Sequence, residues 1–172
     1  MVTTSFSPFP YLETERLSLW QMEKADAAAV LALRADERVN QYIDRKAMQS
    51  IEEAENFIEK INKNIESGLC MYWAVAEKQT NVFLGTACIW NIVEEESKAE
   101  LGYELIFEAQ GKGYMQEAIP KILEFGFQKM GLKIMEAVIL EGNERSIRLA
   151  EKNGFSFTKK EGKILYYNLT IK

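Results

Sequence analysis

Three apolar, strand-like segments follow one another in the middle of this 172-residue chain, and they constrain its fold more than any other feature. They cover residues 71–77, 81–92 and 99–106 and are rich in Trp, Tyr, Val, Ile and Leu, the residue types that favour strands. Polar interruptions at residues 78–80 and 94–96 separate them. Consecutive strands of this kind predict one sheet as the framework of the chain.

Helical patterns lie on both sides of these strands. Asp36 can cap one short helix, Ser50 and Glu53 form a capping box at the head of another, and Asn143 can cap a third. The expected elements are a strand over 16–21, helices over 25–33 and from Ser50 to about Glu66, a helix over 113–130, a strand over 134–140, a helix from Asn143 to Lys152, and a hairpin of 155–159 with 164–171.

The predicted order, β-α-α-β-β-β-α-β-α-β-β, indicates a mixed α/β fold around one central sheet. Strand and helix alternate only in the second half of the chain. No repeat, low-complexity tract or Pro/Gly-rich linker divides the sequence. We therefore expect a single domain over residues 1–172.

Composition excludes several classes of function. A net charge of -5 argues against a nucleic-acid partner and fits, weakly, a cationic small molecule or a basic peptide. The longest apolar run, residues 69–76, is too short to cross a membrane, and residues 1–10 have no basic residue of a signal peptide. Cys70 and Cys88 form no CxxC pair, so we expect small buried thiols in a reduced, cytoplasmic protein.

The absence of histidine restricts the chemistry most. Ser-His-Asp and Cys-His catalysis are excluded, as are metal sites with histidine ligands, and no metal is expected. Proton transfer must then use carboxylates, Tyr, Ser, Lys, water or backbone groups.

The most informative stretch is a strand that enters a glycine-containing turn, Gln110-Gly111-Lys112-Gly113, directly before a helix. Glycines let backbone N–H groups converge at the positive end of the helix dipole, which is a site for a pyrophosphate. Two glycines can also serve only to make a tight turn. The third glycine of the dinucleotide-binding fingerprint and the G-K-[ST] of the P-loop are both missing.

The stretch from Gln110 to Met115 resembles the acetyl-coenzyme A signature Q/R-x-x-G-x-G/A of the GNAT acetyltransferases. Four further strings are similar to the ribosomal-protein N-acetyltransferase branch of that superfamily. They are Glu13-Thr14-Glu15-Arg16-Leu17, Glu100-Leu101-Gly102-Tyr103, Asn143-Glu144-Arg145-Ser146 and Lys152-Asn153-Gly154-Phe155, with Glu117-Ala118 following the turn. The resemblance covers nearly the whole chain in the right order. Met115 departs from it, because the family usually has Gly or Ala there, and a larger side chain can crowd the cofactor.

The resemblance implies a GNAT-like fold with a splayed central sheet and acetyl-CoA as co-substrate. The turn residues Gln110, Gly111, Lys112, Gly113, Tyr114 and Met115 are then expected to bind the pyrophosphate. Leu105 and Ile106 are expected to pair with the pantetheine amides through their backbones, much as an added strand does. Asn143 either contacts the pantetheine or acts only as a helix cap.

Transfer to an amine needs a base, and a donor to the departing thiolate assists it. Glu100 and Glu104 are four residues apart on one strand, hence on the same face, and either is a candidate base; both can also belong to a solvated face. Glu100 is preferred because it matches the branch's Glu-x-Gly-Tyr string. Ser146 matches the branch's serine near the sulfur and can relay a proton, and Tyr103 is an alternative donor or a core residue.

The expected function is direct, sequential N-acetyl transfer from acetyl-CoA to an amine, without an acyl-enzyme on cysteine. The alternatives are a coenzyme A sensor without turnover and a transferase for a longer acyl chain. The acceptor stays open among a protein or peptide N-terminus, a polyamine, an antibiotic and another small-molecule amine. Residues 40–48, Tyr42, Trp73 and Trp90 are candidates for selecting it. The oligomeric state also stays open, with a homodimer among the alternatives; no nucleic-acid or membrane partner is expected.

Overall fold

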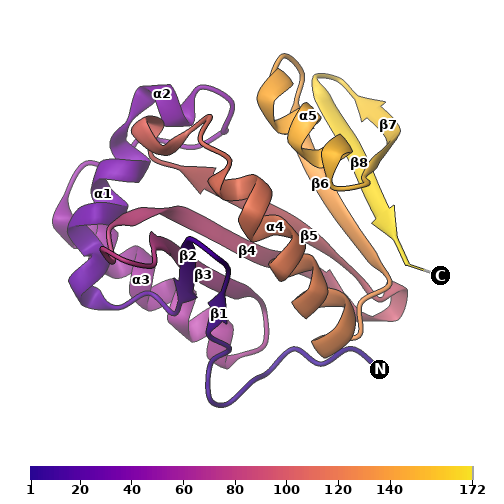
Figure 1. Ribbon diagram of the computed structural model, residues 1–172, viewed down its shortest axis with the longest axis horizontal. Coiled ribbons are helices and arrows are strands. Elements are labelled where there is room, and N and C mark those ends of the chain that lie inside the picture. Colours follow the sequence, from indigo (N-terminus) through magenta and orange to yellow (C-terminus); the bar gives the residue numbers. More distant parts are fainter. Residues whose placement is uncertain (172) are drawn as a thin grey trace.

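One eight-stranded sheet forms the centre of the molecule in the computed structural model, which describes residues 1–171 (Figure 1). Its strand order is β1-β2-β3-β4-β5-β6-β8-β7, and neighbouring strands are antiparallel except β5 and β6, which are parallel. The strands are β1 (Leu12–Glu13), β2 (Leu17–Trp20), β3 (Met71–Glu77), β4 (Phe83–Val93), β5 (Lys98–Leu105), β6 (Ile134–Leu140), β7 (Ser156–Glu161) and β8 (Ile164–Thr170).

Five α-helices accompany the sheet, and their first turns follow from the sequence. Ser50 accepts a hydrogen bond from the N–H of Glu53, Asp36 from that of Arg38 and Asn143 from that of Ser146, so the three predicted caps are confirmed. The helices are α1 (Ala27–Ala35), α2 (Glu37–Asn40), α3 (Ile51–Glu66), α4 (Tyr114–Glu124) and α5 (Glu144–Lys152), with short 3-10 turns at Lys24–Asp26, Glu94–Glu96 and Phe107–Ala109.

The predicted mixed α/β fold and its element order are confirmed, with one addition at the N-terminal side. The two-residue strand β1 precedes the first expected strand and is too short to give a periodic sequence signal. The single-turn helix α2 is the short helix expected after Asp36, which the predicted order did not count separately.

Helices cover both faces of the sheet because side chains alternate along its strands. On β3, Trp73 and Val75 belong to the core that includes α4, whereas Ala74 belongs to the core that includes α1 and α3. Figure 1 shows α4 crossing the sheet at the front, with α3 behind it. The sheet therefore separates two cores.

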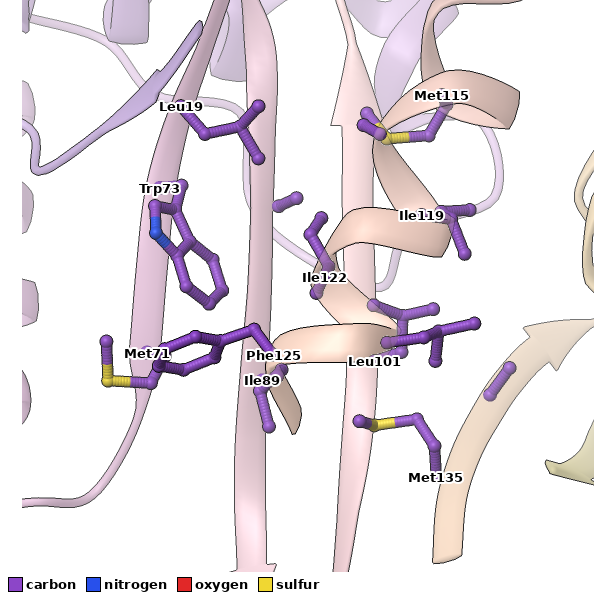
Figure 2. Packing of buried hydrophobic residues seen from close by; sticks show 14 of the residues in the cluster. Leu19, Met71, Trp73, Ile89, Leu101, Met115, Ile119, Ile122, Phe125 and Met135 are labelled. Atoms are coloured by element: carbon purple, nitrogen blue, oxygen red, sulfur yellow. The ribbon is translucent and has the colours of Figure 1, made fainter. Parts of the chain in front are cut away.

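The larger core is built around α4 and the aromatic residues of the sheet. Trp73 is fully buried, packs edge-on against Phe125 and donates a hydrogen bond from Nε1 to the carbonyl oxygen of Pro10, 2.9 Å away. Figure 2 shows Met115, Ile119 and neighbouring side chains of α4 pointing into this core. The packing fixes the start of α4 relative to the sheet.

The long predicted helix is continuous through Pro120 but changes its winding afterwards. Residues Phe125–Lys129 form a π-helical segment, marked by the bond from the N–H of Met130 to the carbonyl of Phe125. No local sequence pattern indicates this π-helical segment. Because Pro120 has no N–H to donate to the carbonyl of Gln116, we predict a bend of the helix between these residues.

Candidate active site

The glycine turn before α4 leaves backbone N–H groups unused. Gly111 and Gly113 have φ of 76° and 81°, in the left-handed region that favours glycine. The first backbone bond of α4 runs from Glu117 N–H to the carbonyl of Gly113, so the N–H groups of Tyr114, Met115 and Gln116 have no partner inside the helix. A Cβ added at Gly111 meets no atom within 4 Å, so the space beside this turn is open.

A carboxylate of α4 and a guanidinium from the loop between β1 and β2 brace this turn. Glu117 Oε1 accepts from the backbone N–H of Arg16 at 2.7 Å and from Thr14 Oγ1, and Glu117 Oε2 accepts from Arg16 Nε at 2.7 Å. Arg16 Nη1 also donates to the carbonyl oxygen of Lys112, 3.1 Å away. Two separated strings of the sequence, Thr14–Arg16 and Glu117, thus form one unit that holds the turn.

The sheet splays open next to the turn. β5 and β6 pair only at their first residues, and the last pair is Glu100 with Glu136. Beyond it the strands diverge, as Figure 1 shows. The splay expected between the strands before and after the long helix is therefore present.

Two adjoining cavities lie at the splay. The first, of about 730 Å³, is lined by β3, β4, β5, β6 and residues of α1 and α3; the second, of about 800 Å³, is lined by the glycine turn, α5 and residues of α2. Residues common to both walls are Tyr42, Ile43, Tyr103, Glu104, Asn143 and Ser146. We name the first the β-face cavity and the second the turn cavity.

A hydroxyl pair stands where the two cavities meet. Tyr103 Oη and Ser146 Oγ are 2.6 Å apart and connect β5 to α5 across the splay. Burial raises the pKa of the Tyr103 hydroxyl, so it keeps its proton at neutral pH. The two side chains named as alternative donors are thus brought together as one hydrogen-bonded unit.

Glu100 lies at the closed end of the splay, in the wall of the β-face cavity. Its Oε2 accepts a hydrogen bond from Asn91 Nδ2 at 2.8 Å. Burial raises the pKa of its carboxyl above the ordinary value, against the smaller effect of the Asn91 hydrogen bond. A carboxylate of this kind takes up a proton more readily than one in water.

Glu104 is also in the cavity wall, but it is already paired with cations. Its Oε2 lies 2.7 Å from Arg45 Nη1 and its Oε1 lies 3.6 Å from Arg34 Nη1. Its side chain is 9% exposed. The Glu104 carboxylate is therefore occupied by the salt bridge to Arg45 and lies against Arg34, so it is less free to meet a substrate amine. Glu100 is the stronger candidate on this ground.

Some of the remaining residues expected at the cofactor site line the turn cavity and one does not. Gln110 and Leu105 line the turn cavity, and Gln110 Nε2 donates to the carbonyl of Leu105 at 3.1 Å. Asn143 lines both cavities and is the cap of α5. Ile106 lines neither cavity, its N–H donates to the carbonyl oxygen of Leu84 and its carbonyl accepts from Ala109, so its pairing with the pantetheine stays a prediction.

Met115 does not obstruct the turn. Its side chain is 4% exposed and points into the core beside Ile119 (Figure 2). A methionine is therefore accommodated at the position where the family usually has Gly or Ala, because its side chain packs into the core. The backbone N–H of Met115, at the head of α4, is the group of this residue that can bind the cofactor.

The predicted acceptor aromatics are divided by the sheet. Tyr42 and Trp90 line the β-face cavity, but Trp73 lies on the opposite face, buried in the core, so its assignment was wrong. The period of two along β3 that places Trp73 with Val75 could have indicated this.

Both cysteines lie in the wall of one cavity. Cys70 and Cys88 line the β-face cavity and are absent from the wall of the turn cavity. Burial raises the pKa of the Cys70 thiol to about 11, and burial also raises that of Cys88. Both thiols are therefore neutral and poor nucleophiles at pH 7.

A group of cations around the turn cavity was not singled out from the sequence. Arg38, Arg145, Arg148 and Lys152 all line this cavity. Arg145 Nη1 donates to Gln110 Oε1 at 2.5 Å, and the Arg38 guanidinium stacks on Phe107 at 4.2 Å from the ring centroid. The Arg145–Arg148–Lys152 spacing of three and four residues on one helix was the available signal.

Residues 1–171 contain neither a metal-binding cluster nor a membrane-spanning helix. No group of three or more Cys, Asp or Glu side chains there is arranged to hold a metal ion. None of the helices in the same range is long and apolar enough to cross a membrane.

Comparison with known proteins agrees with this geometry. Residues 16–156 match the family model described as "Acetyltransferase (GNAT) domain". The uncharacterized N-acetyltransferase YoaA of Bacillus subtilis is 34% identical over 159 residues, which are 92% of this chain and 88% of the relative.

Solved structures share the fold. RimL, a ribosomal-protein acetyltransferase in complex with coenzyme A, superposes with a TM-score of 0.85 at 17% identity, covering 94% of this chain and 98% of RimL. The spermidine N-acetyltransferase of Vibrio cholerae, with coenzyme A and spermine, gives a TM-score of 0.78 at 21% identity over 90% and 95% of the two chains. The chain therefore belongs to the GNAT acetyltransferase family and is an N-acetyltransferase.

Proposed function

We propose that this enzyme transfers the acetyl group of acetyl-CoA directly to a primary amine at the junction of its two cavities. The observation that carries the proposal is the open splay of β5 and β6 beside a glycine turn with unused N–H groups. Two neighbours of the same fold are complexes with coenzyme A.

The chain offers a separate place for each part of the cofactor. The N–H groups at the head of α4 and residues 110–113 would hold the pyrophosphate in the turn cavity. Arg145, Arg148 and Lys152 supply positive charge for its phosphates. Leu105 and Asn143 would border the pantetheine arm on its way to the junction.

The reaction needs one proton acceptor and one proton donor. When bound, acetyl-CoA supplies the acetyl group as a thioester; a C–N bond forms to the neutral amine and the C–S bond breaks. Glu100 would take the proton of the ammonium group, directly or through water. After the C–N bond forms, the nitrogen would lose a second proton, and Tyr103 would donate its own proton to the departing thiolate. The second proton from nitrogen would return to Tyr103 through Ser146, so both hydroxyls end protonated. Positioning of the two substrates supplies most of the acceleration, and acid–base assistance adds about 10²–10⁴-fold.

Direct transfer is favoured over an acyl-enzyme. The raised pKa of Cys70, to about 11, leaves a very small thiolate fraction at neutral pH. No cysteine intermediate is required by the geometry of the junction.

Acetylation of a mixed library of amines and peptides, followed by mass spectrometry, tests the proposal. The expected result is a mass increase of one acetyl group on amines, dependent on acetyl-CoA and on enzyme. A protein that binds acetyl-CoA but modifies no amine in such a library would be a coenzyme A sensor. Faster transfer from longer acyl thioesters would instead identify an acyltransferase of different donor preference.

A further inference from the structure

Two arginines and one glutamate form a buried charge cluster in the wall of the β-face cavity. Arg34 comes from α1, Arg45 from the segment between α2 and α3, and Glu104 from β5. Their side chains are 20%, 13% and 9% exposed. Two cations therefore face one carboxylate in a largely dehydrated place, which leaves one positive charge uncompensated.

The hydrogen-bonding capacity of the cluster is also incomplete. Arg45 donates from Nε to Asn40 Oδ1 at 2.8 Å and from Nη1 toward Glu104, but its Nη2 is buried and has no hydrogen-bond partner among residues 1–171. Glu104 Oε1 is likewise buried without a hydrogen bond in that range. Buried polar groups normally have partners, so an unpartnered guanidinium nitrogen in a cavity wall points to a missing acceptor.

Arg34 has its guanidinium held flat in the same wall. It stacks on the ring of Phe57 at 4.1 Å from the centroid, and its approach of 3.6 Å to Glu104 is too long for a hydrogen bond. Burial and the neighbouring charge of Arg45 lower the pKa of Arg34, as expected where positive charge is in excess. Stacking leaves the in-plane donors of the guanidinium available to an anion.

The cluster and the proposed base lie at different positions along the same strand. Glu100 and Glu104 are four residues apart on β5, about 13 Å along a strand. Both residues line the β-face cavity. A small molecule can therefore span the cavity with one end near Glu100 and the other near Arg34 and Arg45.

We propose that the acceptor is a small amine carrying an anionic group, carboxylate or phosphate, that binds to Arg34 and Arg45 while its amine faces Glu100 and Tyr103. This inference names the acceptor class for the site under the proposed function and rests on it. The anion would supply the acceptor that Arg45 Nη2 lacks and balance the excess charge. A polyamine would instead place a second ammonium group beside two guanidinium groups, which costs free energy.

Binding to the enzyme loaded with coenzyme A tests the acceptor class separately from turnover. The probes are four series of matched chain lengths: short amino carboxylates, their primary amides, aminoalkyl phosphates and diamines. Calorimetry measures the affinity of each probe. At the preferred length, the carboxylate or the phosphate is expected to bind at least about tenfold more tightly than the amide, since charge-assisted hydrogen bonds are the stronger ones. The ratio of carboxylate to phosphate affinity identifies which anion is used.

Three substitutions in the cluster and one control outside it connect the preference to the cluster. Arg45→Met and, independently, Arg34→Met are expected to reduce the anion-to-amide affinity ratio by at least about tenfold. Lys60→Met removes an exposed charge on α3 that lines neither cavity and should leave the ratio unchanged. Glu104→Gln removes the only carboxylate contact recorded for Arg34 and Arg45 among residues 1–171 and should keep or increase the preference for anions.

Some results would overturn the inference. Diamines binding as tightly as the anionic probes, or a preference for anions that survives in both Arg→Met variants when circular dichroism shows them folded, would show that the cluster only supports the fold. Loss of diamine binding in Glu104→Gln would assign a cationic acceptor to the same place. Anion-selective binding without any acetyl transfer would leave the inference standing and contradict the proposed function instead.

Discussion

At the scale of single residues, Glu100 and Glu104 show how similar carboxylates acquire different properties. Both lie on one face of β5, as the spacing of four predicts. Glu100 has one amide donor and a raised pKa, whereas Glu104 is held by two arginines from elements before β3. Sequence spacing placed them on one face, but their long-range partners could not be read from the sequence.

Glu100→Gln is expected to lower kcat about tenfold or more, since an amide cannot accept the proton. Affinity for acetyl-CoA should be little changed, because Glu100 lies at the end of the splay away from the turn. Glu95→Gln, an exposed neighbour that lines neither cavity, is the matched control. Unchanged kcat in Glu100→Gln together with a loss in Glu104→Gln would move the base to Glu104.

The pH profile gives a second test of Glu100. Its pKa is raised in the folded protein, so the protonated form persists to higher pH than for an ordinary carboxyl, and activity should rise as pH increases through this raised value. The acid limb of kcat/KM should therefore lie above the usual range of glutamate. In Glu100→Gln this limb should flatten; an identical limb in wild type and variant would contradict the assignment.

Tyr103 and Ser146 are expected to act as one unit. Tyr103→Phe and Ser146→Ala should each lower kcat, and the double variant should lose little more than Tyr103→Phe alone, since the second proton transfer passes through the 2.6 Å contact. Steady-state kinetics of the four proteins give the coupling. Fully additive losses would show that the two hydroxyls work independently.

At the scale of elements, the caps, the strand cores and the extent of the long helix were well predicted, whereas the π-helical winding of its last part was not. Met71–Glu77 and Ile134–Leu140 have the predicted bounds, and α5 ends where predicted, because apolar runs and caps are local signals. The π-helical turn after α4 depends on packing instead. An ideal Cβ at Gly126 would lie 2.8 Å from Met135 Cε and 3.2 Å from Ile89 Cδ1, contacts that no local pattern reveals.

Gly126→Ala is therefore expected to destabilise the protein by about 1–3 kcal/mol, the usual cost of overpacking a core. Alanine favours helix more than glycine, so propensity alone predicts the opposite sign. Denaturant unfolding measures the difference. A variant as stable as wild type or more stable would show that the neighbouring side chains move aside freely.

At the scale of the whole molecule, the fold and the family followed from the sequence because five separated strings lie in the right order. The structure explains why the first string and Glu117, which follows the turn, occur in the same sequence. Thr14–Arg16 and Glu117 form the brace behind the glycine turn. In the wall of the β-face cavity, Arg45 belongs to the segment 40–48 singled out from the sequence, whereas Arg34 of α1 and Tyr72 of β3 gave no sequence signal. A single domain and a cytoplasmic location stay predictions, and the oligomeric state stays open.

The central claim is that the open glycine turn binds acetyl-CoA for transfer to an amine, and substitution of Gly111 tests it most directly. Gly111→Asn adds a side chain to the open space while tolerating the left-handed backbone, and Gly162→Asn makes the same change at a distant hairpin turn with φ of 58°.

The measurement is coenzyme A release from acetyl-CoA in the presence of an amine mixture, with acetyl-CoA affinity measured on the same three proteins. Wild type and Gly162→Asn should release coenzyme A at similar, amine-dependent rates. Gly111→Asn should remain folded yet bind acetyl-CoA at least about tenfold more weakly, because its side chain blocks the approach of phosphate to the backbone N–H groups. Equal affinity and equal release by Gly111→Asn would contradict the account.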